Sequence, residues 1–164
     1  MNERIFITLG SQKFQFNRLL KAVDELCEKK FIVAEDVFAQ IGYSDYLPQN
    51  YRYKSFLDRE EFSSEIGKSD IVITHGGTGA IIGAVKKGKK VIAIPRLAKY
   101  REHVDDHQLQ VIKQFDDLNL ICSCQEISEL KKALEIVRHT KYNSYESNTI
   151  NIINSIENYI KESV

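Results

Sequence analysis

The chain has 164 residues, of which 43% are hydrophobic and 28% are charged, a composition typical of one soluble globular domain. Lysine plus arginine and aspartate plus glutamate number 23 each, which argues against a broadly basic nucleic-acid-binding protein but allows a local basic patch. No apolar run approaches the roughly 20 residues that span a bilayer, so we expect any membrane association to depend on a partner.

Short apolar runs predict six strands, at residues 5–9, 37–41, 51–57, 70–74, 90–94 and 120–124. Helical spacing predicts helices over 16–29, 80–87, about 104–117, 127–138 and 148–162. A further helix is expected from Asp58 to Ile66 or Gly67, because Asp58 and Glu61 have the spacing of a capping box. The apolar face of the last helix fits two roles equally well, covering the sheet or docking a partner.

Three cysteines indicate a reducing, cytoplasmic compartment, because their number is odd and neither a C-x-x-C pair nor a secretory signal is present. Cys122 and Cys124 lie two residues apart in an apolar run, so they are expected to share one buried face of a strand.

Strands that alternate with helices predict an α/β fold, an open parallel Rossmann-like sheet with helices on both faces, in a single domain over 1–164. Ligands of such sheets bind at the carboxyl ends of the strands. Three loops fall there: Gly10-Ser11, the turn at 74–79 and the segment after Pro95. We therefore expect these three loops to meet at one edge of the sheet.

The turn T-H-G-G-T-G at 74–79 is the strongest candidate site. A buried strand, a glycine-dense turn and a helix together make a cradle for phosphate, because glycines allow close approach and the helix N-terminus offers unpaired N–H groups. His75 at its mouth can donate a hydrogen bond to a phosphate oxygen. The pattern is neither a Walker A motif nor G-x-G-x-x-G. The alternative is a tight turn that binds nothing.

Other candidates lie in the segment after Pro95. Asp106 and Gln108 have side chains that hold sugar hydroxyls, although an N-cap followed by polar surface fits them as well. Arg96, with Lys99 and Arg101, could clamp a diphosphate or form a solvated loop. His103 and His107 have the spacing of a metal pair, but no third ligand is near and no metal is expected.

Four segments carry a resemblance to a known family: I-F-I-T-L-G-S at 5–11, H-G-G-T-G at 75–79, V-I-A-I-P-R at 91–96 and E-H-V-D-D-H-Q at 102–108. Together they resemble the C-terminal domain of family 28 glycosyltransferases, over roughly residues 4–140. The chain looks similar to the small donor-binding subunits of two-part enzymes. These include the PssE-like proteins of exopolysaccharide and capsule assembly, and the eukaryotic subunit that helps add the second N-acetylglucosamine to dolichol-linked sugar.

The resemblance implies one half of a GT-B glycosyltransferase, with the acceptor half in a separate, membrane-bound subunit. It implies inverting, metal-independent and cofactor-free transfer from a UDP-sugar to a lipid-linked saccharide of capsule or exopolysaccharide assembly. The chain would lie in the cytoplasm, held at the inner face of the membrane by its partner. Two alternatives are a non-catalytic nucleotide-sugar-binding module that regulates or scaffolds a partner, and, ranked last, a sugar-nucleotide epimerase.

Roles of single residues follow from the same resemblance. The diphosphate is expected against His75 and the residues after it, Gly76, Gly77, Thr78 and Gly79, with Gly10 and Ser11 in the facing loop. Asp106 and Gln108 are expected to meet the donor sugar, and the loop from Arg96 to Glu102 to lie beside the nucleotide.

Two questions stay open in this assignment. The general base is expected on the partner, with His103 as the local candidate. Many relatives place a ribose-binding glutamate where this chain has Gly83, so Glu102 or another group must replace it, or ribose is held less tightly.

Overall fold

The computed structural model describes residues 2–144, 146, 151, 154–156, 158, 161 and 162. The helix expected over 148–162, together with the docking role considered for it, lies for the most part outside the described residues. Every residue of the candidate site lies before residue 145.

Within the described residues, six strands form one parallel sheet in the order β3-β2-β1-β4-β5-β6. They are β1 (Ile5–Thr8), β2 (Val37–Gln40), β3 (Arg52–Lys54), β4 (Ile71–Thr74), β5 (Lys90–Ala93) and β6 (Cys122–Ser123). The strand order reverses between β1 and β4, where Thr8 pairs with Thr74, so both strands end at the same height. This confirms the predicted parallel sheet, and the β1–β4 junction is the point where ligands of such sheets commonly bind.

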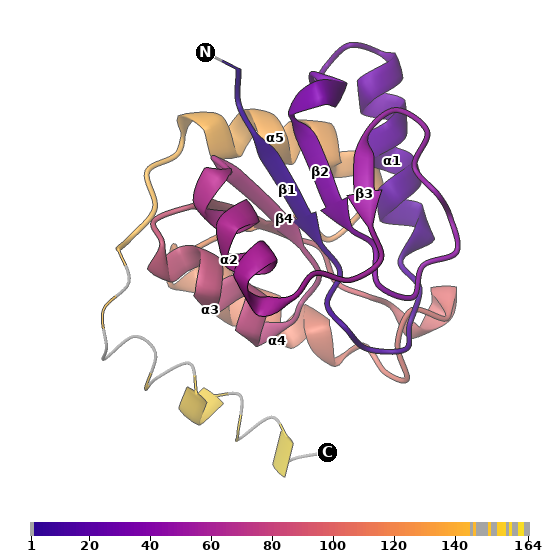
Figure 1. Ribbon diagram of the computed structural model, residues 1–164. Coiled ribbons are helices and arrows are strands. Elements are labelled where there is room, and N and C mark those ends of the chain that lie inside the picture. The colour runs from indigo at the N-terminus through magenta and orange to yellow at the C-terminus, as the bar shows by residue number, and fades with distance from the viewer. Residues whose placement is uncertain are drawn as a thin grey trace.

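Helices cover both faces of the sheet, as predicted (Figure 1). They are α1 (Asn17–Glu28), α2 (Arg59–Lys68), α3 (Thr78–Lys86), α4 (His107–Asp117) and α5 (Leu130–His139). Apolar side chains of α1 and α5 share one buried cluster with Ile5 and Ile7, and those of α3 and α4 share a second cluster with Val72. α2 joins the second face, since Phe62 packs edge-on against Phe6 with ring centroids 5.6 Å apart.

Several expected boundaries differ from the structure. The strands expected over 51–57 and 120–124 shrink to β3 and β6, because an edge strand has a hydrogen-bonded neighbour on one side only. α3 begins two residues before the expected start at Ala80, so Gly79 is part of its first turn. The capping box of α2 is confirmed, with Glu61 N–H donating to Asp58 at 2.8 Å. Both Cys122 and Cys124 are buried, also as expected.

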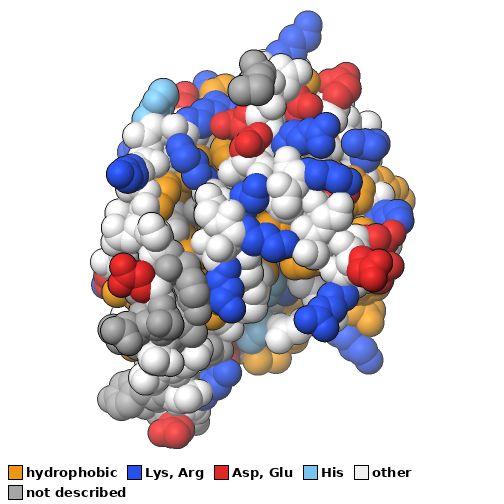
Figure 2. Space-filling model, turned by 60° about the vertical axis from the view of Figure 1, so that its left-hand side comes forward, with side chains coloured by type: hydrophobic (Ala, Val, Ile, Leu, Met, Phe, Trp, Pro, Cys, Tyr) orange, Lys and Arg blue, Asp and Glu red, His pale blue; other side chains and the backbone are white. Residues whose placement is uncertain are grey.

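Positive charge is unevenly distributed although the formal net charge is zero. Lys and Arg side chains gather near the middle of the face in Figure 2. At the amino ends of β4 and β5, two hollows of about 500 and 390 Å³ are both lined by Lys89 and Lys90. These hollows lie at the opposite end of the strands from the glycine turn.

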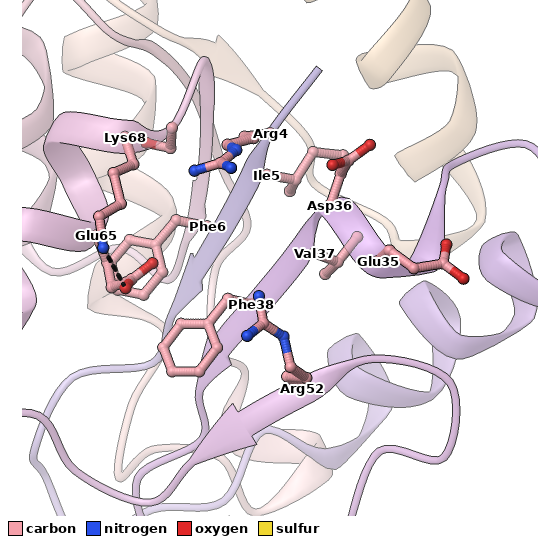
Figure 3. Close-up of a pocket in the computed structure, with 11 residues that line it drawn as sticks. Arg4, Ile5, Phe6, Glu35, Asp36, Val37, Phe38, Arg52, Glu65 and Lys68 are labelled. Atoms are coloured by element: carbon pink, nitrogen blue, oxygen red, sulfur yellow. Dashed lines mark hydrogen bonds and ion pairs between the residues drawn. The ribbon is translucent and has the colours of Figure 1, made fainter. Parts of the chain in front are cut away.

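A smaller hollow lies at the amino ends of β1, β2 and β3 (Figure 3). Arg4 and Arg52 stand at its rim around Phe6 and Phe38, whose rings stack with centroids 6.2 Å apart. Its volume of about 50 Å³ is far below the roughly 300 Å³ of a small-molecule site.

None of the described helices is both long enough and apolar enough to cross a bilayer.

Candidate functional site

Three loops meet at the carboxyl ends of the central strands, as the sequence predicts. Gln108, in the first turn of α4, accepts hydrogen bonds from the backbone N–H of Gly76 after β4, at 3.0 Å, and of Arg96 after β5, at 2.9 Å. The Arg96 side chain donates to the carbonyl of Leu9 after β1, at 2.8 Å. The loops are therefore joined by direct hydrogen bonds through buried side chains.

The glycine turn is compact on its inner side and open at the start of α3. A Cβ atom on Gly76 would lie 2.5 Å from the Gln108 side chain, and one on Gly77 would lie 2.3 Å from the His75 ring, whereas one on Gly79 would meet nothing within 4 Å. Gly77 is the N-cap of α3 and supplies no side-chain cap. Gly79, in the first turn of α3, is exposed, and the first N–H groups of a helix are the ones without a partner inside the helix.

His75 is enclosed between the glycine turn and the loop after β1. Its side chain is 6% exposed, and its Nε2 lies 2.7 Å from where a Cβ on Gly10 would stand. Gly10 has a φ of +72°, a left-handed conformation that also favours glycine, while Ser11 beside it is exposed. Burial, followed by electrostatic interactions with Arg96 and His103, lowers the His75 pKa to about 3. The ring is therefore neutral near neutral pH.

Arg96 and Glu102 lie inside the protein rather than in the exposed charged loop that the sequence suggested. Arg96 is 0% exposed, and it donates to the carbonyls of Leu9 and Phe14, while its Nε and Nη1 make no hydrogen bond with any described residue. Burial lowers its pKa to about 10, which still leaves the guanidinium charged at neutral pH. Glu102 is 1% exposed and pairs with Arg18 Nε at 2.7 Å.

Asp106 and His103 lie nearer the surface. Asp106 is exposed and accepts a hydrogen bond from the Ala98 N–H at 2.8 Å, which holds the start of α4 against the loop. The His103 ring packs on Phe14 with centroids 5.1 Å apart, and its Nδ1 lies 3.2 Å from Asp105. No group of three or more His, Cys, Asp or Glu that could hold a metal ion occurs among the residues that were placed.

Sequence reasoning missed Gln15, just before α1, and Arg18, in its first turn, which hold the loop after β5. Arg18 donates to the Pro95 carbonyl at 2.9 Å as well as pairing with Glu102, and its guanidinium lies 4.6 Å from the centre of the Tyr100 ring. The Gln15 side chain donates to the carbonyl of Tyr100 at 2.9 Å. No local pattern marks these residues, because their partners lie 77 to 86 residues further along the chain.

The model of the glycosyltransferase family 28 C-terminal domain matches residues 4–163 of this chain. The chain belongs to this family. The architecture agrees with the assignment, since the solved glycosyltransferase CalG4 superposes over 99% of this family 28 chain with a TM-score of 0.61 at 17% identity. That match takes in only 38% of CalG4, so the chain has the fold of one half of a GT-B glycosyltransferase.

Two further comparisons concern ALG13. The human UDP-N-acetylglucosamine transferase subunit ALG13 is 25% identical over 132 residues, which are 76% of this chain but 11% of the human protein. The solution structure of ALG13 superposes with a TM-score of 0.60 at 18% identity, covering 88% of this chain and 89% of that one. The family 28 chain therefore spans about a tenth of the human relative that it matches.

Proposed function

We propose that this chain is the donor-binding, catalytic subunit of a two-component inverting glycosyltransferase that takes its sugar from a UDP-sugar. The observation that carries the proposal is the position of the N-terminus of α3, where Gly79 is exposed, at the β1–β4 junction beside His75 and the Gly10 loop. A pyrophosphate is the group that fits this place, because it is anionic and accepts several hydrogen bonds.

The proposed chemistry is displacement at the anomeric carbon, with UDP as the leaving group. Its pyrophosphate gains negative charge in the transition state, so the fixed N–H groups of residues 77–79 and a hydrogen bond from His75 stabilise the transition state more than the bound donor. The buried charge of Arg96 adds a positive potential under the same loops. The proton of the acceptor hydroxyl goes to a general base, for which the candidates are His103 and a group on the partner.

The partner in this proposal is the acceptor-side half of the enzyme. A chain that matches 38% of CalG4 corresponds to one wall of a GT-B cleft, and in this proposal the partner supplies the other wall. We place that subunit at the membrane, with this chain bound to its cytoplasmic side. UDP-N-acetylglucosamine is the first donor to test, since ALG13 is named for it. A lipid-pyrophosphate saccharide of capsule or exopolysaccharide assembly is the acceptor suggested by the sequence, and no relative described above carries such a name.

One observation favours the rival proposal of a non-catalytic nucleotide-sugar-binding module. Gly83 on α3 has open space around it and carries no carboxylate to hold ribose hydroxyls. Glu102 does not replace it in this structure, because Arg18 and the Leu97 N–H occupy its carboxylate. Weaker binding of the nucleotide is therefore expected, and a regulatory role would tolerate that better than turnover would.

Co-expression with a candidate membrane partner, followed by a panel of UDP-sugars on a lipid-linked acceptor, tests the proposal. We expect transfer by the complex, little or none by this chain alone, and loss of turnover with intact assembly in His75→Ala. The matched control is His139→Ala, because His139 is exposed at the end of α5. Full transfer by the purified single chain would refute the two-component model. Undiminished transfer by the His75→Ala complex would favour the non-catalytic module.

A further inference from the structure

Gln108 is a buried glutamine whose amide joins three groups of the candidate site. Its side chain belongs to the first turn of α4, and the residue is 5% exposed. Oε1 accepts from the backbone N–H of Gly76 at 3.0 Å and of Arg96 at 2.9 Å, and Nε2 lies 3.4 Å from Nδ1 of His75. These contacts turn the Gln108 side chain toward the interior of the protein.

The contacts of Gln108 fix which end of its amide is the oxygen. Both backbone groups are N–H donors, so the atom that they share must be an acceptor. The NH₂ end then faces His75 and can only donate to it. A neutral imidazole carries one hydrogen, and a nitrogen that accepts a hydrogen bond cannot carry it. The hydrogen of His75 is therefore on Nε2.

We propose that Gln108 is a positioning residue that holds His75 as the Nε2–H tautomer and so aims a neutral N–H donor at the space between Gly10 and Gly77. That space is bounded on both sides, since a Cβ on either glycine would stand 2.7 Å from Nε2. The identity of the acceptor, a donor pyrophosphate oxygen, rests on the function proposed above. The tautomer itself does not.

The surroundings of His75 favour a neutral donor over a charged one. Burial disfavours the imidazolium, and electrostatic interactions with the Arg96 guanidinium and with His103 add to this effect. A glutamate at position 108 would reverse the arrangement, because a carboxylate only accepts hydrogen bonds. It could still take the two backbone N–H bonds, but toward the ring it would draw a hydrogen onto Nδ1. Only an amide serves both sides at once.

The direct test is long-range ¹H–¹⁵N NMR of the His75 ring in the unliganded full chain, from about pH 5 to about pH 8. We expect the neutral Nε2–H pattern in the wild type and in Gln110→Glu, which adds the same charge at an exposed position two residues along α4. In Gln108→Glu we expect a hydrogen on Nδ1, as the neutral tautomer or the imidazolium. An Nδ1–H pattern in the wild type would overturn the proposal, whether or not the variant folds. An unchanged Nε2–H pattern in folded Gln108→Glu would overturn it as well.

A UDP titration by calorimetry separates this inference from the proposed function. In Gln108→Glu with the neutral Nδ1–H tautomer, loss of one hydrogen bond to a charged ligand predicts UDP binding at least about tenfold weaker, with Gln110→Glu within about twofold of the wild type. An imidazolium keeps its Nε2–H donor, so no such loss is expected for that form. Equal affinity of the wild type and of Gln108→Glu in the Nδ1–H tautomer would refute a role for the tautomer in binding. Absence of UDP binding by the wild type would contradict the proposed function, while the NMR result would still decide the tautomer.

Discussion

Replacement of Gly77 by alanine tests how closely His75 packs against the glycine turn. The backbone tolerates the change, since Gly77 has a φ of −82° and a ψ of 120°. The added Cβ, however, would lie 2.3 Å from Cε1 of His75, where ordinary contact begins at 3.4 Å. The ring would have to move by about 1.1 Å, and Gln108 and Gly10 limit that movement. Such overpacking costs about 1–3 kcal/mol.

Alanine also lowers the entropy of the unfolded chain, which offsets about 0.4–1 kcal/mol of that cost. We therefore expect the free energy of unfolding to fall by about 1–2 kcal/mol in Gly77→Ala, and the melting temperature by about 2–8 °C. Circular dichroism during heating and urea titration measures both. The control is Gly83→Ala, also on α3, where an added Cβ meets nothing within 4 Å. It should raise stability by about 0.5–1 kcal/mol. Equal stability of the two variants would refute the packing described here.

Three more predictions concern separate parts of the chain. Gly83→Glu places a carboxylate about 7.5 Å along α3 from Thr78 and should tighten UDP binding about tenfold. The uncharged control is Gly83→Gln, and equal UDP affinity of the two variants would contradict a ribose site there. Arg18→Met leaves the buried Glu102 carboxylate without its ion-pair partner. The free energy of unfolding in urea should therefore fall by about 3 kcal/mol or more. A fall of less than about 1 kcal/mol would mean that the pair is solvated. Burial raises the pKa of Cys27 to about 11 and of Cys124 to about 12. A thiol reagent at about pH 8 should therefore label both cysteines only after unfolding. Rapid labelling of the folded chain would contradict their burial.

The sequence was sufficient for the architecture and for the meeting of three loops at one edge of the sheet. Short apolar runs, three of them followed directly by glycine or proline, are enough to locate parallel strands and the loops at their carboxyl ends. The glycines at 76 and 77 proved necessary, because side chains there would collide with Gln108 and His75. Local patterns report such features well, since their physical causes are local.

The orientation of charged side chains could not be predicted in this way. Arg96 and Glu102 stand in a charged segment that looks like a solvated loop, yet both are buried. Glu102 is neutralised by Arg18, 84 residues away, and Arg96 is held by the Leu9 carbonyl, 87 residues away. The two backbone donors of Gln108, on Gly76 and Arg96, are likewise not encoded near it in the sequence. Contacts between distant segments decide these cases, and no local pattern encodes them.

The central claim is that the N-terminus of α3 and the Gly10 loop receive the pyrophosphate of a nucleotide. Titration of the ¹⁵N-labelled chain with UDP tests it most directly, because each backbone amide reports its own surroundings. The account predicts progressive chemical-shift changes at Gly10, Ser11, Gly77, Thr78 and Gly79, with inorganic pyrophosphate moving the same amides and uridine alone moving them little. Shifts confined to the amino ends of the strands, or none at millimolar UDP, would contradict it.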